Sequence, residues 1–310
     1  MNQGIDKTDL GRVAVLLGGR AAEREISLIS GRAVLEALRR QGVDAHPFDP
    51  ADGLTGLTAD AFTRAFVVLH GRGGEDGVIQ GYLDSVGLAY TGSGVAGSAL
   101  AMDKYRSKLL WRGLGLATPD FIVARDAGGL SAAARLGFPL MVKPAHEGSS
   151  IGIRKVDDLA ALESAWREAA ALDDEVLIEQ WIDGAEYTCA LLGARALPLI
   201  RLETTNPFYD YAAKYQDEDT LYHCPSGLDE ATEKAFQELA RTAFAALGAS
   251  GWGRIDLMVD GSGRPWLIEA NTVPGMTDHS LVPMAARAAG IDFDELVLRI
   301  AASAGHGGAR

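Results

Sequence analysis

The chain has 310 residues, of which 47% are hydrophobic and 23% charged, and its formal net charge at pH 7 is -13. This length predicts two or three domains, and the composition is typical of a soluble globular protein. The negative charge argues against nucleic acid as a partner, because binding to a phosphate backbone needs a positive field. No apolar run approaches the roughly 18 residues that span a membrane, and the polar N-terminus has no signal-peptide core.

The cysteine content points to the same class of protein. Cys189 and Cys224 are the two cysteines of the chain, and they lack the spacing of a metal site. We interpret both as reduced packing residues. We therefore expect a cytoplasmic protein that has no membrane partner.

The first part of the chain alternates between short apolar runs and helical patterns. Val13 to Leu17 is a predicted strand, and the helical pattern after it places Ile29 on its apolar face and ends at Gly42. Further strands are predicted at 45–48, 65–69 and 88–91, with a helix at 79–86. This alternation predicts an open α/β sheet of parallel type.

The middle section mixes strands, helices and short glycine-rich loops. Helices are predicted from Met102 to Arg112 and over the alanine-rich stretch 159–172. Strands are predicted at 121–124, 140–143, 151–156 and 176–182. Because short loops as well as a helix join these strands, we expect a second domain that is α+β and antiparallel.

A long polar segment follows the next two predicted strands, 187–192 and 197–202. It runs from Thr204 to Pro225, and loops of that length are usually lids, binding loops or disordered. The aromatic side chains of Tyr209 and Tyr211 favour a folded lid. A helix predicted at 229–247 leads from this segment into a final pair of strands.

The stretch from Gly253 to Thr272 reads as two strands joined by a tight turn. If Ser262-Gly263 is a two-residue loop, Asp256 pairs directly across from Glu269, and Asn271 shares their face. Two carboxylates and a carboxamide amid apolar neighbours suit Mg²⁺ presented with a nucleotide. A solvated face of an edge hairpin explains the same pattern equally well.

Five other segments have both a functional and a plain structural interpretation. Gly71 to Gly77 is a ligand loop or a flexible turn. Gly92 to Gly97 matches the dinucleotide fingerprint but follows the wrong strand for it. Lys143 to Gly152 is a phosphate-binding loop or a hairpin. The run Glu179 to Ile182 is an adenine-binding strand end or a plain strand edge. In the segment after Pro274, Ser280 is a plausible N-cap of a helix, whose free N–H groups either bind an anionic ligand or are only capped.

Taken together, these segments resemble one family over nearly the whole chain. The chain resembles the ATP-grasp ligases, and within them the D-alanine–D-alanine ligases. The residues that carry the resemblance are the segments 22–27, 70–77, 90–94, 102–104, 147–150, 209–215, 253–256, 269–272 and 274–277. Departures from the family pattern occur at Arg20, Ala21, His146, Val273 and Asp278.

The resemblance implies a three-domain ATP-grasp architecture. It has an N-terminal open parallel sheet, and the nucleotide is held between two antiparallel-sheet domains. The implied division is 1–93 for the N-terminal domain that binds the first substrate, 94–186 for the central domain, and 187–310 for the C-terminal catalytic domain with a lid loop at 204–225. A homodimer is also implied.

The resemblance further implies ATP-dependent ligation of two D-alanines through an acyl phosphate, for peptidoglycan precursor synthesis. Two Mg²⁺ ions, or Mn²⁺, would bind Asp256, Glu269 and Asn271. The implied residues for ATP are Lys104, Lys143, Glu179, Trp181, Ile182, Glu186 and Lys214. Those for catalysis or for D-alanine are Glu23, His70, Ser149, Tyr215, Arg254, Gly275, Ser280 and Leu281.

Three other functions stay open at this point. The first is an ATP-grasp ligase whose acceptor is D-serine or D-lactate. The second is a nucleotide-binding regulatory protein without catalysis, against which Arg254, Asp256, Glu269 and Asn271 argue. The third, a dinucleotide oxidoreductase, depends on the weak fingerprint at Gly92 to Gly97.

Overall fold

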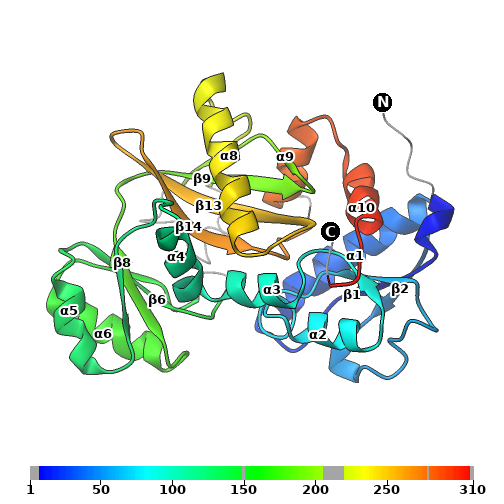
Figure 1. Cartoon of the computed structure of the whole chain (residues 1–310), viewed down its shortest axis with the longest axis horizontal. Coiled ribbons are helices and arrows are strands. Elements are labelled where there is room, and N and C mark those ends of the chain that lie inside the picture. Colours follow the sequence, from blue (N-terminus) through cyan, green and yellow to red (C-terminus); the bar gives the residue numbers. More distant parts are fainter. Residues whose placement is uncertain (1–6, 149–150, 205–219, 278, 308–310) are drawn as a thin grey trace.

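The computed structural model describes residues 7–148, 151–204, 220–277 and 279–307. These residues form three β-sheets with helices packed around them (Figure 1). The sheet nearest the N-terminus lies at one end of the molecule, a second sheet with α5 and α6 lies at the other, and the third lies between them. Within the described ranges, no helix has the length and apolar character that crossing a membrane requires.

The first sheet is parallel, and its strand order is β2-β1-β3-β4. Val13 to Leu16 are fully buried, as expected for a strand of a parallel sheet covered on both faces. The predicted open parallel sheet is therefore confirmed. The strands are β1 (Arg12–Leu16), β2 (Asp44–Phe48), β3 (Arg64–Val67) and β4 (Ala89–Tyr90), with α1 (Arg24–Arg40), α2 (Val78–Ser85), η1 (Lys7–Leu10) and η2 (Pro50–Asp52) around them.

The buried face of α1 includes Val34, Ala37 and Leu38, as the periodicity predicts, but not Ile29. Ile29, expected against the sheet, has an exposed fraction of 52%. The buried stripe runs instead through Ser27, Ser30 and Gly31. A Cβ atom at Gly31 would lie 2.3 Å from the Cβ of Leu17, so this glycine lets α1 approach the end of β1 closely and turns Ile29 outward.

Two helices, α3 (Val95–Met102) and α4 (Lys104–Gly113), connect the first sheet to the second. The Asp103 carboxylate between them accepts a hydrogen bond of 2.8 Å from the Arg106 amide and so caps α4. The predicted start of a helix at Met102 is therefore wrong, since Met102 ends α3. The sequence gives little sign of α3, because its small apolar residues have no clear periodicity.

Packing explains the glycines of the G-x-G-x-x-G match. A Cβ atom at Gly94 would lie 2.1 Å from the carbonyl oxygen of Gly307, and one at Gly97 would lie 2.4 Å from that of Gly248. Both glycines allow close approach of α3 to other backbone. This geometry favours the structural interpretation of the segment over a dinucleotide site.

The second sheet is antiparallel, with the order β5-β8-β6-β7, as predicted. Two predicted strands are too long. Ile151 lies in a turn, where its amide donates to the Gly148 carbonyl, and Trp181 and Ile182 follow the end of β8. The elements are β5 (Phe121–Ala124), η3 (Ala127–Gly129), α5 (Leu130–Ala134), β6 (Leu140–Pro144), β7 (Arg154–Val156), α6 (Leu159–Ala170) and β8 (Val176–Gln180).

The third sheet is also antiparallel, with the order β12-β11-β9-β13-β14 and β10 beside β9. β12 lies inside the segment predicted as the loop 204–225, so that prediction is wrong at its C-terminal end. Tyr209, Tyr211, Lys214 and Tyr215 lie outside the described residues. The elements are β9 (Gly184–Leu192), β10 (Arg195–Ala196), β11 (Ile200–Glu203), β12 (Leu221–His223), α8 (Glu230–Ala246), β13 (Trp252–Asp260), β14 (Pro265–Asn271), α9 (Leu281–Ala288) and α10 (Phe293–Ala302).

Three hydrophobic clusters hold these sheets. One combines β1, β3 and α1 with residues of α9 and α10, so the C-terminal helices pack beside the N-terminal sheet. A second lies between α8 and the third sheet, and the third cluster lies under α5 and α6. The division of the chain at residues 93 and 186 stays a proposal.

The hairpin β13–β14 has the predicted pairing of Asp256 with Glu269, but its turn differs from the predicted two-residue loop. Its turn has three residues, Gly261 to Gly263, because the Gly263 amide donates to the Asp260 carbonyl and the Asp260 amide to the Arg264 carbonyl. An odd loop alone would displace the register by one residue. A β-bulge next to Asp256 restores it, so that Asp256 lies directly across from Glu269.

Candidate active site

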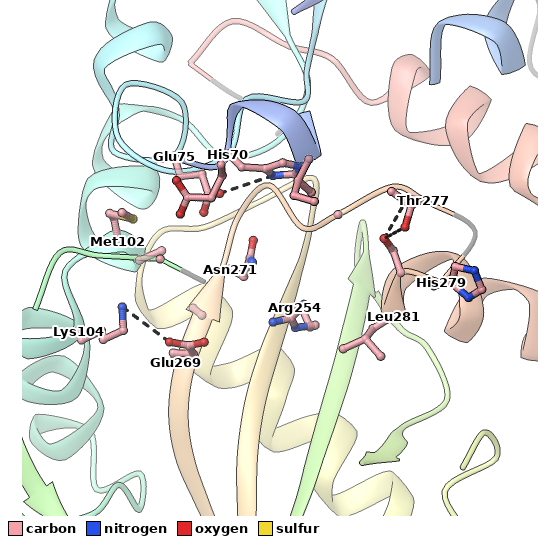
Figure 2. A pocket seen from close by; sticks show the side chains of 17 residues that line it. His70, Glu75, Met102, Lys104, Arg254, Glu269, Asn271, Thr277, His279 and Leu281 are labelled. Carbon is pink, nitrogen blue, oxygen red and sulfur yellow. Dashed lines mark hydrogen bonds and ion pairs between the residues drawn. The ribbon is translucent and has the colours of Figure 1, made fainter. Parts of the chain in front are cut away.

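A cavity of about 150 Å³ lies between the start of α1, the start of α4 and the β13–β14 hairpin (Figure 2). Residues distant in the sequence meet there, from Glu23 to Leu281. The predicted site residues that line it are Glu23, His70, Lys104, Arg254, Glu269, Asn271, Gly275, Ser280 and Leu281. The sequence thus identified about half of the lining residues.

The floor of the cavity comes from three polar residues of the hairpin, Arg254, Glu269 and Asn271, and Asp256 lies next to them but outside the residues that line the cavity. Arg254 pairs across the strands with Asn271, and Asp256 pairs with Glu269, so all four side chains share a face. Asp256 is buried, and the Thr188 hydroxyl on β9 donates to its Oδ1 at 2.6 Å. Arg254 donates to both Asp256 oxygens, each at 2.7 Å.

Lys104, the first residue of α4, points toward this floor (Figure 2). Its Nζ lies 3.7 Å from Glu269 Oε2 and also donates to the carbonyl oxygen of Glu147. The side chain is buried, with an exposed fraction of 8%. It therefore connects the hairpin to the loop after β6.

Glu23 precedes α1 and is also buried. A Cβ atom at Gly71 would lie 2.4 Å from its Oε2, and one at Gly148 would lie 2.8 Å from its Oε1. The carboxylate thus lies against two glycines from different loops. Both loops, for which the sequence left a functional and a structural interpretation open, therefore reach the cavity next to Glu23.

His70 and Ser280 are held by backbone contacts at the edge of the cavity. His70 Nδ1 lies 2.8 Å from the Val273 carbonyl oxygen. Ser280 occupies the N-cap position of α9, but its hydroxyl makes no cap bond and instead accepts from the Thr277 amide at 2.9 Å. The predicted capping role of Ser280 is wrong in this respect, and its side chain lies beside Gly275.

Lys143 and Glu179 lie outside the residues that line the cavity, in a buried cluster between β6, β8 and α4. The Glu179 carboxylate forms ion pairs with Lys143 and, at 2.7 Å, with Lys108. Burial acts to raise the pKa of Glu179, but the two ammonium groups lower it overall. Burial acts to lower the pKa of Lys143. The negative charge of Glu179 outweighs this effect, and with smaller contributions from Glu269 and Glu186 it raises the pKa above its ordinary value.

The remaining predicted residues have separate positions. Glu186 is on β9, on the same face as Thr188 and Asp256. Trp181 and Ile182 are half-buried, and Lys155 Nζ lies 4.9 Å from the Trp181 ring. Ser149, like Lys214 and Tyr215, lies outside the described residues.

A second polar cluster supports the start of α4. His146 is half-buried, with its Nε2 3.2 Å from Asp103 and its Nδ1 2.9 Å from Asp173. The hydrogen bond with Asp103 is the main cause of the raised pKa of His146. Burial raises the pKa of Asp103, but its contacts with His146 and Arg106 outweigh this and lower it to about 2.

The sequence missed several residues of the site. Glu75 lies in the glycine-rich loop that was singled out, and its Oε1 accepts from the Gly71 amide at 2.9 Å. His279 lies beside Ser280 at the cavity, but a lone histidine in a loop gives no signal. Ile26, Met102 and Thr277 also line the cavity, and such residue types are common in any core.

Comparison with known proteins shows which family the chain resembles. A family model described as the D-ala D-ala ligase C-terminus matches residues 110–302. The D-alanine–D-alanine ligase of Nitrosococcus oceani is 60% identical over 301 residues, which are 96% of this chain and 95% of that protein. The D-alanine–D-alanine ligase of Alkalilimnicola ehrlichii is 62% identical over 293 residues, with 94% of each chain covered.

Solved structures give the same result. The D-alanine–D-alanine ligase from Bacillus anthracis complexed with ATP has a TM-score of 0.82 and 32% identity, covering 94% of this chain and 96% of that one. The VanG D-Ala:D-Ser ligase from Enterococcus faecalis also has a TM-score of 0.82, with 29% identity, and the match covers 94% of this chain and 98% of that one.

Proposed function

The chain belongs to the D-alanine–D-alanine ligase family, and we propose that the cavity between β13, β14 and α4 is its active site. The protein is an ATP-dependent ligase that joins two D-alanine molecules for peptidoglycan synthesis. The observation that carries the site proposal is the convergence of Glu23, Lys104, Arg254 and Glu269 on one cavity.

The chemistry requires activation of a carboxylate, which is a poor acyl donor. The first D-alanine carboxylate attacks the γ-phosphorus of ATP and releases ADP, giving an acyl phosphate. The amine of the second D-alanine then attacks the acyl carbon, phosphate leaves with the electron pair of the C–O bond, and the amine loses a proton. Each step develops negative charge on oxygen, so positive groups at the site accelerate it.

Glu23 is proposed to bind the ammonium group of the first D-alanine. Its carboxylate is buried against Gly71 and Gly148 at one side of the cavity. A buried carboxylate favours a cationic partner because the pair offsets the cost of removing its charge from water. His70, fixed on the Val273 carbonyl, lies on the same side.

Arg254 and the Gly275 amide are proposed to stabilise the oxyanion on the acyl carbon, and Ser280 and Leu281 to receive the second carboxylate. Lys104 is proposed to bind phosphate, as is Lys143. Lys104 already faces an acidic residue, Glu269, across the cavity floor. A phosphate group with its metal ion would share these charges.

The donor set of Asp256, Glu269 and Asn271 fits a divalent cation that prefers oxygen ligands. We propose two Mg²⁺ ions, or Mn²⁺, at these residues. When bound, such ions neutralise phosphate charge during transfer.

Five further assignments complete the proposal. Glu179, Trp181, Ile182 and Glu186 would bind the adenosine part of ATP, and Lys214 would bind its phosphates. Ser149 and Tyr215 would fix Glu23 and close a lid. We also propose a homodimer and a cytoplasmic location, where ATP is supplied. Light scattering during gel filtration would test the dimer, and fractionation of the producing cells would test the location.

The direct test is phosphate release from ATP with and without D-alanine. We expect release to depend on D-alanine and on a divalent cation. ATP hydrolysis that ignores D-alanine, or nucleotide binding with no turnover, would contradict the proposal.

The acceptor requires a separate measurement, because a D-Ala:D-Ser ligase shares this fold. We propose D-alanine as the second substrate. Mass spectrometry of products formed with equal D-alanine, D-serine and D-lactate should show D-alanyl-D-alanine in excess. A predominant D-serine or D-lactate product would reassign the acceptor.

A further inference from the structure

Lys108 is a fully buried lysine for which the ligation chemistry above assigns no role. It lies one helical turn after Lys104 on α4, so both side chains project from the same face of the helix. Lys104 reaches the cavity, whereas Lys108 extends into the contact between α4 and β8. Its Nζ faces Glu179 Oε2 at 2.7 Å as an ion pair, although the two are not aligned as a hydrogen bond.

A hydroxyl group fixes Lys108 from the opposite side. The Nζ donates to Thr118 Oγ1 at 2.6 Å, and Thr118 Oγ1 donates to the carbonyl oxygen of Leu267 at 2.8 Å. Leu267 belongs to β14, the strand that carries Glu269. The chain of contacts therefore joins the second sheet to the strand of the proposed metal site through one lysine.

The cluster has two lysines and one carboxylate. Glu179 Oε1 contacts Lys143, and Glu179 Oε2 faces Lys108, while all three side chains are almost inaccessible to water. A buried carboxylate with a single cationic partner holds that partner strongly, because separation would leave an unpaired charge. With Lys108 present, Glu179 keeps a partner when Lys143 moves away.

We propose that Lys108 is a positioning residue for ATP, which holds the Glu179 carboxylate so that Lys143 is free to bind phosphate. The inference rests on the proposed role of Lys143 in ATP binding. Without Lys108, Lys143 is the sole remaining cation in contact with Glu179 among the described residues. The nucleotide would then compete with a buried ion pair.

Burial agrees with an electrostatic role for Lys108. Desolvation, with the nearby Lys143 and Arg112 acting in the same direction, lowers the pKa of Lys108 to about 8, although Glu179 opposes the decrease. The aromatic ring of Phe121 lies 5.8 Å from the ammonium group. Burial disfavours the charged form of a lysine, so the ammonium group of Lys108 depends on its contacts with Glu179 and Thr118.

The experiment compares Lys108→Met in two backgrounds, the natural chain and Glu179→Gln. In the natural background we expect the KM for ATP to rise at least 10-fold, while the KM for D-alanine changes less than 2-fold. In the Glu179→Gln background Lys143 is already free, so Lys108→Met should change the KM for ATP less than 3-fold. Thr118→Val is the matched control, because it removes a Lys108 partner but keeps both charges, and we expect it to leave the KM for ATP within 2-fold.

Equal losses of ATP affinity in both backgrounds, or an unchanged KM for ATP in Lys108→Met, would overturn the inference. If Lys108→Met does not fold alone, the double variant still gives a result, because a large increase in its KM for ATP relative to Glu179→Gln contradicts the proposal. Lys143→Met tests the underlying assignment separately. An unchanged KM for ATP there would refute the role of Lys143 itself.

Discussion

Arg254, on the floor of the cavity, and Asp256, next to it, bind each other through two hydrogen bonds of 2.7 Å. The first residue is proposed for the acyl oxyanion and the second for a metal ion. Both oxygens of Asp256 are therefore occupied by the residue beside it on the same face of β13. A cation bound to an Asp256 oxygen would compete with Arg254 for the charge of that carboxylate, which would loosen the pair and make the guanidinium more available to substrate.

This relationship predicts that Arg254→Met has two measurable effects. Loss of an oxyanion donor costs about 3 kcal/mol, so turnover should fall roughly 100-fold. Without Arg254, Asp256 is a buried carboxylate that gains more from a cation. The increase of Tm on addition of MgCl₂ should thus be larger for Arg254→Met than for the natural chain. An equal increase, or the same gain in the double variant with Asp256→Asn, would contradict this reasoning.

The metal assignment predicts that Glu269→Gln lowers turnover by at least roughly 100-fold, because the cation loses a charged ligand. Phosphate release measured over a range of MgCl₂ concentrations is the test, and the variant should need more MgCl₂. Glu238→Gln, on the exposed side of α8, is a control that removes a carboxylate away from the cavity. Near-normal turnover in Glu269→Gln would remove Glu269 from the site.

The contact between Glu23 and Gly71 predicts a substrate-specific effect of a methyl group. Gly71 and Gly73 both have positive φ, at 72° and 81°, so alanine strains the backbone at either position by about 1 kcal/mol. A Cβ atom at Gly71 would meet the Glu23 carboxylate, whereas one at Gly73 would meet nothing within 4 Å.

We therefore expect a larger loss of Tm for Gly71→Ala than for Gly73→Ala, and a KM for D-alanine raised roughly 10-fold in Gly71→Ala alone, which corresponds to about 1.4 kcal/mol. Steady-state kinetics and thermal unfolding of both variants test this expectation. A matching increase of the KM in Gly73→Ala would mean that strain, not contact with Glu23, is responsible.

The cluster around His146 predicts a pH-dependent contribution to stability. The pKa of His146 is raised above 6.5 and that of Asp103 is lowered from 3.8 to about 2. The contribution of His146 is fully present below pH 6.5 and is lost as pH rises through its raised pKa. The contribution of Asp103 is present above pH 3.8 and is lost as pH falls toward 2. Together they stabilise the fold most between about pH 4 and pH 6.5.

The loss of Tm in His146→Gln should therefore be larger at pH 6 than at pH 9. Thermal unfolding at both pH values measures it. His223→Gln removes a histidine from a more exposed pair with Glu203 and should show little change at either pH. An identical loss at pH 6 and pH 9 would exclude a charged His146 as the cause.

The sequence predicted the chemistry of the hairpin better than its geometry. Asp256 lies opposite Glu269 as expected, but through a three-residue turn and a bulge and not through a two-residue turn. Alternation along a strand depends on local chemistry and is readable. The bulge follows from packing between strands, which a single segment does not contain.

The exposure of Ile29 and the burial of Lys108 were also not predicted from the sequence, again because contacts between distant segments decide them. Periodicity places Ile29 in the core, but Gly31, which lies close to Leu17, and its neighbour Ser30 are buried in place of Ile29. Lys104 was recognised through its motif, whereas Lys108, at the spacing of a solvated helix face, gave no sign of its burial. The contacts that decide these cases join residues far apart in the chain.

The exposed three-residue turn of the β13–β14 hairpin is a position where the chain can be extended. The turn Gly261 to Gly263 is exposed and lies beyond the Val259–Pro265 pair, and the bulge lies between that pair and the Asp256–Glu269 pair. Residues inserted at the tip would lengthen an exposed ribbon without altering which side chains face the cavity. A peptide tag or a fluorescent label could therefore be placed there to follow the enzyme at work.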